Sequence, residues 1–165
     1  MNIGILTTLL LFVTLCLTQV LVLNNIHLFN VATPLLYVYM VLRFRRNYSK
    51  AGILLWCFTM GIIIDMFSNT PGVATAAMTA VGFIQPHLLE PFIPRDSADD
   101  FQPSMKTLGT STFTYYTVII TLIYCILYFS LEMFDFFNIL FWTECVVGST
   151  ILTTLLIMAV EKVRR

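Results

Sequence analysis

Apolar stretches of nearly membrane-spanning length dominate this sequence of 165 residues. A helix needs roughly 20 predominantly apolar residues to cross the hydrocarbon core of a bilayer. Hydrophobic residues make up 58% of the chain and charged residues 11%, whereas an ordinary soluble domain carries roughly 25% charged residues. The sequence therefore predicts an all-α polytopic membrane protein, built as a single transmembrane domain over residues 1–165. The expected helices cover residues 3–23, 26–42, 51–67, 71–89, 108–131 and 136–160.

The positive charges predict how this bundle lies in the membrane. Arg43, Arg45, Arg46 and Lys50 form a basic loop after the second expected helix, and the tail at 161–165 is also basic. Short loops rich in Lys and Arg usually face the cytoplasm. The expected helices between these two clusters return the chain to the same side, so both termini are predicted to be cytoplasmic. The loop either serves only this topogenic role, which is favoured, or also contacts anionic lipid or a cytoplasmic partner.

Asp65 is the residue that a spanning helix tolerates least. Insertion scales place the free-energy penalty of a central Asp at roughly 2.5–3.5 kcal/mol. A turn at Pro71 and Gly72 follows, and Asp65 could accept hydrogen bonds from the backbone amides that begin the next helix. It could instead bind a proton, an ion or a substrate amine, but the structural role is favoured. Gln19, late in the first expected helix, is similarly expected to hydrogen-bond across helices.

The fourth expected helix carries a row of small residues. Gly72, Ala76 and Ala80 recur every four residues and so share one helix face. Small side chains let membrane helices approach closely, and close packing drives their association. This face is expected to lie inside the bundle, so that Ala76→Leu disrupts folding or assembly.

No pattern in the sequence indicates catalysis. No nucleophile stands beside a base, no glycine-rich phosphate loop is present, and the four cysteines lack metal-ligand spacing. We expect no enzyme activity, no catalytic residue, and no cofactor or metal site. The net charge of zero gives no field that would favour nucleic acid. An ion site at the outer half of the bundle is a weaker alternative, formed by Asp65, Glu132, Asp135 and Glu144.

Several features occur together over nearly the whole chain. Gln19 ends the first expected helix, Pro34 opens the second, and the basic loop follows. A core of the form Gly61-x-x-x-Asp65 precedes the turn at 71–72 and the small-residue helix. This pattern resembles the MreD family of bacterial rod shape-determining membrane proteins. The segments at 83–86 and 94–96 resemble the version found in Bacteroidetes-type members.

The resemblance implies a non-enzymatic scaffold in the bacterial cytoplasmic (inner) membrane. Such proteins pair with the bitopic membrane protein MreC. They work with MreB, RodA and a penicillin-binding transpeptidase to direct peptidoglycan synthesis and maintain cell shape. The family is thought to share its fold with the substrate-binding components of energy-coupling-factor vitamin transporters.

Two other functions stay open. The chain could be the substrate-binding membrane subunit of a small-molecule (vitamin) importer, or, with less support, an ion-coupled carrier that uses Asp65. An importer needs an outward pocket with polar and aromatic walls, whereas a scaffold needs lateral contact surfaces. The aromatic residues that could line such a pocket, although packing is the commoner role, are Phe113, Tyr115, Tyr116, Tyr124 and Tyr128.

Overall fold

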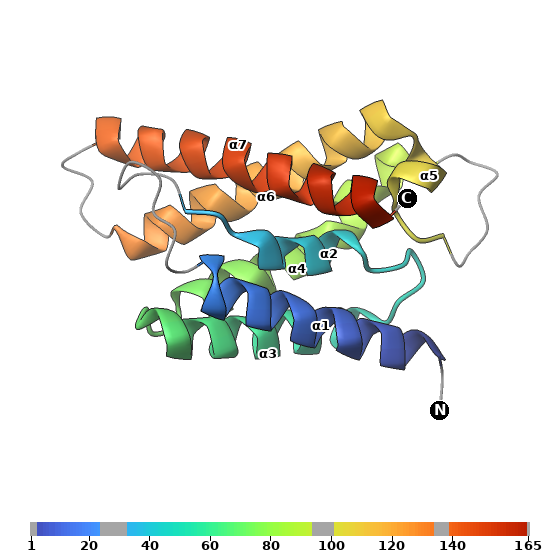
Figure 1. The fold of residues 1–165 in the computed structure, drawn as a ribbon, viewed down its shortest axis with the longest axis horizontal. Helices are drawn as coiled ribbons and strands as arrows, with labels where there is room; N and C mark the ends of the chain where they lie inside the picture. The colour runs from blue at the N-terminus through green and yellow to red at the C-terminus, as the bar shows by residue number, and fades with distance from the viewer. Residues whose placement is uncertain (1–2, 24–32, 94–100, 134–138, 165) are drawn as a thin grey trace.

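The computed structural model describes residues 3–23, 33–93, 101–133 and 139–164, and all regular structure in these residues is helical (Figure 1). This confirms the prediction of an all-α protein for the described part of the chain. The long helices are α1 (Ile3–Leu21), α3 (Lys50–Ser68), α4 (Val73–Leu89), α6 (Thr110–Glu132) and α7 (Ile139–Arg164). The short ones are η2 (Leu36–Val38), α2 (Tyr39–Leu42), η3 (Glu90–Phe92) and α5 (Met105–Leu108).

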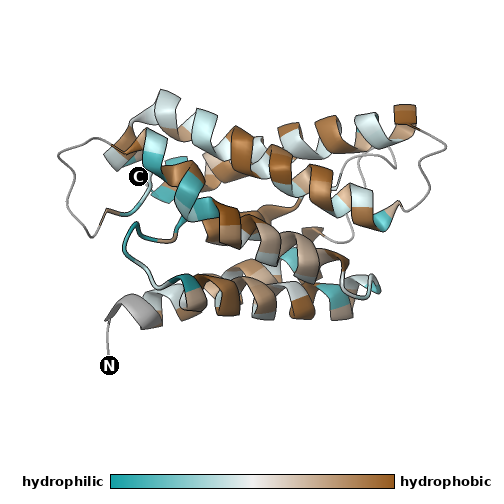
Figure 2. Ribbon diagram, turned by 180° about the vertical axis from the view of Figure 1, so that it is seen from behind, coloured by the Kyte–Doolittle hydropathy of each residue, from teal (hydrophilic) through white to brown (hydrophobic). Residues whose placement is uncertain are grey.

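Three of the described helices, α3, α6 and α7, are long and apolar enough to cross a bilayer. The part of α1 from Leu6 to Leu21 is also apolar but shorter, and α4 has 17 residues. Figure 2 shows hydrophobic residues along the helices and hydrophilic residues gathered towards the two ends of the bundle. This distribution indicates a membrane protein, as predicted, whereas the number of crossings stays a prediction.

The helices form three rough layers. Figure 1 shows α1 and α3 on one side, α6 and α7 on the other, and α2 and α4 between them. The start of α1 and the end of α7 lie at the same end of the molecule. We call this the basic end, because the described Lys and Arg residues all lie in the segments that meet there: Arg43, Arg45, Arg46, Lys50, Lys106, Lys162 and Arg164.

The second predicted helix, 26–42, is not continuous in the structure. Residues 33–35 are not helical, and helix is present only in η2 and α2, while residues 24–32 lie outside the described part. Pro34 explains the break, because proline has no N–H and disfavours helical geometry in the residue before it. Irregular backbone at membrane depth must find hydrogen bonds within the protein.

Side chains from neighbouring helices supply those hydrogen bonds. The amide of Thr33 donates to Ser149 Oγ at 3.1 Å, and the amide of Leu35 donates to Thr153 Oγ1 at 3.0 Å. Residues 35–42 are all buried. This segment therefore lies at the centre of the bundle, and hydroxyl groups of α7 accept hydrogen bonds from its backbone amides.

The small-residue face of α4 does not lie where the sequence predicted. The helix does pack between α3 and α6, but Gly72 and Ala76 are exposed and Ala80 is half-buried. The closest approach between α3 and α4 uses other glycines. A Cβ added to Gly61 would lie 2.4 Å from Thr75 Cα, and one added to Gly82 would lie 2.6 Å from Cys57 Sγ.

We expect Gly61→Ala to lower the free energy of unfolding by about 2–3 kcal/mol, as overpacking of a tight contact does. The new methyl group would meet backbone atoms of α4, which cannot move aside as a side chain can. Ala51→Val is the control, because it adds volume at an exposed position of the same helix. Unfolding by SDS in mixed micelles measures both, and equal stabilities would contradict the contact.

Candidate partner-binding groove and buried polar networks

Asp65 holds the start of α4. Its Oδ1 accepts hydrogen bonds from the amide of Ala74 at 2.8 Å and from Thr70 Oγ1 at 3.2 Å. Its Oδ2 accepts from the amide of Thr75 at 2.9 Å and from Thr75 Oγ1 at 2.6 Å. The first amides of a helix have no partner within the helix, and a buried acceptor supplies one. The side chain is thus engaged in the structural role favoured from the sequence.

The turn between α3 and α4 sets this geometry. Asn69 ends α3 in the left-handed conformation (φ 56°), and its amide donates back to the carbonyl of Asp65. Gly72 also has positive φ (86°), which glycine adopts without steric penalty. Between them, Pro71 cannot continue the helix. These residues reverse the chain directly after Asp65, so its carboxylate faces the first turn of α4.

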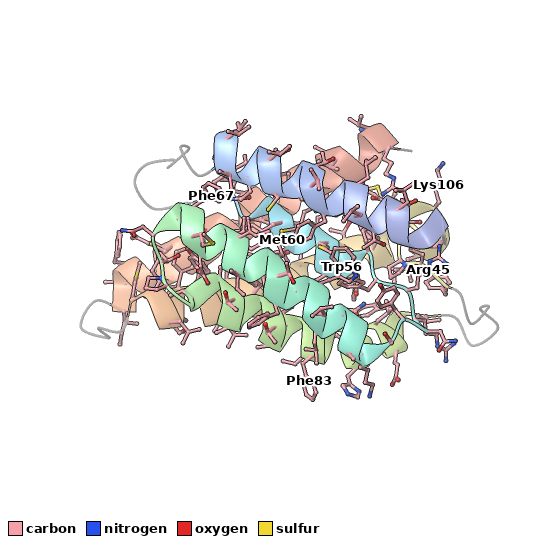
Figure 3. The ribbon with its side chains drawn as sticks, turned by 90° about the horizontal axis from the view of Figure 1, so that it is seen from below. Arg45, Trp56, Met60, Phe67, Phe83 and Lys106 are labelled. Atoms are coloured by element: carbon pink, nitrogen blue, oxygen red, sulfur yellow. The ribbon has the colours of Figure 1, made fainter. Side chains whose placement is uncertain are left out.

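A lateral groove runs along the outer side of α3 and α4. Its volume is about 1130 Å³. Gly72, Ala76 and Ala80 line it together with Thr75, while larger apolar side chains such as Met66 and Phe83 project beside them. Figure 3 shows Phe83 pointing away from the bundle, and the residue is 62% exposed. The exposed row of small residues is therefore part of a concave apolar surface.

Gln19 links α1 to the broken segment. Its Nε2 donates to the carbonyl of Pro34 at 2.9 Å, and its Oε1 accepts from the amide of Leu36 at 3.1 Å. The side chain is 1% exposed. The expected hydrogen bond across helices is present, and its partners are backbone groups freed by Pro34.

A smaller pocket of about 280 Å³ lies at the end of the bundle opposite the basic end. Gln19, Tyr37, Thr70, Tyr128 and Glu132 supply polar groups to its wall. An importer needs a pocket with polar and aromatic walls, and this pocket has both.

Most of the aromatic residues considered for such a pocket pack elsewhere. Phe113, Tyr116 and Tyr124 are fully buried, whereas Tyr115 is 68% exposed. Tyr124 shares a hydrogen bond with the hydroxyl of Tyr37, and Tyr116 accepts one from Gln85 Nε2 at 3.1 Å. Of the five aromatic residues considered, only Tyr128 lines the pocket.

The charged side chains of the basic loop differ in their exposure to solvent. Arg46 and Lys50 are exposed and Arg45 is half-buried. The side chain of Arg43 is only 11% exposed, and its Nη1 lies 3.8 Å from Glu161 Oε1. Burial lowers the pKa of the Arg43 guanidinium, but from so high a value that it stays charged.

Glu161 is a residue that the sequence did not single out. It is 5% exposed and accepts hydrogen bonds from the hydroxyl of Tyr39 and from the amide of Met105, the latter at 3.4 Å. Arg43 Nη1 also donates to the carbonyl of Pro103 at 3.3 Å. The end of α2, the segment before α6 and the end of α7 are thereby joined. The one feature of the sequence that could have pointed to Glu161 is its acidic side chain in an otherwise basic tail.

Of the acids considered for an ion site, Glu144 and Glu132 are exposed, Asp65 is engaged at α4, and Asp135 lies outside the described residues. In the described ranges, no group of three or more His, Cys, Asp or Glu side chains is arranged to hold a metal ion.

No protein-family model matches this chain, and neither the curated proteins nor the solved structures compared with it give a match.

Proposed function

We propose that this protein is a non-enzymatic membrane scaffold of the bacterial cell-elongation complex, which helps to direct peptidoglycan synthesis and maintain cell shape. Its direct partner is an MreC-like bitopic membrane protein, and MreB, RodA and a penicillin-binding transpeptidase belong to the wider complex. The resemblance of the sequence to the MreD family motivates this proposal. The observation that supports it best is the lateral groove of α3 and α4.

The groove has the surface that a spanning partner helix requires. Hydrophobic driving force between helices is weak in lipid, so association depends on van der Waals contact at small residues. Gly72, Ala76 and Ala80 have few side-chain atoms, so this part of the groove lies close to the backbone of α4, and Met66 and Phe83 also line the groove. A single helix laid along this row would contact the backbone of α4 and bury the exposed ring of Phe83.

The proposed orientation of the bundle in the membrane follows from the distribution of its Lys and Arg residues. The basic end faces the cytoplasm, where Lys and Arg of short loops are retained. Both termini then lie on the cytoplasmic side of the inner membrane, and Asp65 lies towards the outer side. The MreB filament is cytoplasmic, so the basic end is the part of the scaffold that lies nearest to it.

We expect Ala76→Leu to abolish binding of the partner helix while leaving the bundle folded. Ala76 is exposed and lines the groove, so the larger side chain would not disturb the interior. Affinity purification from host membranes in mild detergent, probed for the MreC-like protein, should show at least a tenfold loss. Ala159→Leu is the matched control, since it makes the same change at an exposed position of α7. Equal recovery of the partner with both variants would contradict the proposed surface.

The alternative function is that of a substrate-binding subunit of a vitamin importer. The polar pocket beside Tyr128 and Glu132 favours it, and its volume of about 280 Å³ is close to the lower limit of the range of roughly 300–1,000 Å³ typical of small-molecule sites. Purification of the protein with a bound vitamin or with an ATPase partner would support the importer instead of the scaffold.

A further inference from the structure

A second pocket lies at the basic end, away from the lateral groove. Its volume is about 370 Å³, within the range of small-molecule sites. It is lined by Arg43 after α2, by Ser104 and Lys106 in and beside α5, and by Glu161 and Arg164 in the last turn of α7. In a bundle that crosses the membrane, this end lies at the level of the lipid headgroups.

Among the described residues that line this pocket, the charges are unbalanced. Arg43, Lys106 and Arg164 bring three positive charges to its wall, and Glu161 is the one carboxylate in this described lining. That carboxylate is already engaged by the hydroxyl of Tyr39, the amide of Met105 and Arg43. Lys106 and Arg164 are exposed and line the pocket, and the side chain of Arg164 also interacts with the hydroxyl of Tyr39. Both cations are therefore placed to contact a bound anion.

The guanidinium of Arg43 also has unused hydrogen-bonding capacity. Its Nε is buried and has no hydrogen-bond partner within the described residues, although Nη1 is paired with Pro103 and Glu161. A buried donor without a partner carries a desolvation penalty that a ligand can relieve. Guanidinium groups bind phosphate well because their planar donors match its oxygens.

We propose that this pocket binds a phosphate group, with Arg43 at its base and Lys106 and Arg164 closing over it. The phosphate is carried either by an anionic phospholipid of the cytoplasmic leaflet or by a soluble molecule. This site is separate from the groove, and it does not depend on the identity of the partner helix.

The test measures thermal unfolding of the purified full-length protein in dodecyl maltoside micelles. Phosphatidylglycerol is titrated against diacylglycerol with the same chains, and inorganic phosphate against chloride at equal ionic strength. A ligand that binds the folded state raises the unfolding temperature with its concentration. The variant is Lys106→Gln/Arg164→Gln, and the matched control is Arg46→Gln/Lys50→Gln, which removes the same charges outside the pocket.

We expect phosphatidylglycerol, but not diacylglycerol, to stabilise the wild type and the control variant. Loss of Lys106 and Arg164 should weaken the apparent affinity about 30-fold, as expected for two cations near an anionic headgroup. If inorganic phosphate also stabilises the protein, the site is assigned to soluble phosphates. If phosphatidylglycerol alone stabilises it, the site is assigned to lipid.

Three outcomes would overturn the proposal. Diacylglycerol could act as well as phosphatidylglycerol, both double variants could lose binding equally, or the Lys106→Gln/Arg164→Gln variant could bind like the wild type. Native mass spectrometry of the single variant Lys106→Gln, counting retained phosphatidylglycerol molecules, gives the same answer if the double variant does not fold. Retention equal to that of the wild type would then exclude the site.

Discussion

Asp65→Leu is expected to lower the free energy of unfolding by about 4 kcal/mol, because it leaves two amides at the start of α4 without an acceptor. These are the amides of Ala74 and Thr75, which now donate to the two carboxylate oxygens at 2.8 and 2.9 Å. Leucine has the same branching and the same number of side-chain heavy atoms, but it is bulkier and accepts no hydrogen bond. The loss of stability is measured by SDS-induced unfolding in mixed micelles. We expect the variant to impair assembly of the bundle more than any transport activity.

Two further variants make this prediction specific. Asp65→Asn keeps one acceptor oxygen and should lose less stability than Asp65→Leu. Glu144→Leu removes an acid at an exposed position of α7, and an exposed substitution of this kind changes stability by only about 0.5 kcal/mol. If Asp65→Leu were as stable as Glu144→Leu, the carboxylate would not hold α4, and a functional role for Asp65 would be the better explanation.

Glu161→Leu should destabilise the basic end by about 4 kcal/mol, the usual effect of removing one partner of a buried ion pair. Arg43 would keep its charge in a site where its side chain is only 11% exposed. Tyr39 and the amide of Met105 would also lose their acceptor. The same unfolding assay measures the loss.

The double variant Arg43→Met/Glu161→Leu isolates the ionic part of this effect. Removing both charges leaves no uncompensated ion, so about 1–3 kcal/mol of the loss should return. The remaining deficit belongs to the hydrogen bonds that Glu161 accepts. A double variant no more stable than Glu161→Leu would show that the pair does not interact in the folded protein.

The positions of the five long helices could be predicted because they depend on local sequence. Runs of apolar residues between polar turns place α1, α3, α4, α6 and α7 within a few residues of their observed limits. The role of Asp65 was also accessible, since a carboxylate just before a turn and a new helix has backbone amides within reach. Gln19 was expected to hydrogen-bond across helices because a polar side chain within a spanning helix needs a partner on a neighbouring helix.

Other features depend on contacts between distant parts of the chain. The apolar run at 26–42 reads as a helix, but hydropathy does not show that hydroxyls of α7 satisfy the amides around Pro34. Small residues occur on more than one face of α4, so the pattern alone did not show that Gly82 packs inwards while Ala76 faces out. The pairing of Arg43 with Glu161 joins the basic loop to the basic tail, and the sequence of each indicates only ordinary solvated charge.

Depletion of the protein in its bacterial host tests the scaffold function most directly. The measurement is cell length and width by microscopy, with uptake of labelled vitamins followed in the same cultures. We expect cells to lose normal elongation and become wider while uptake is unchanged, and Ala159→Leu, but not Ala76→Leu, to restore shape. Cells that keep their shape but lose uptake of a vitamin would contradict the scaffold and favour the importer.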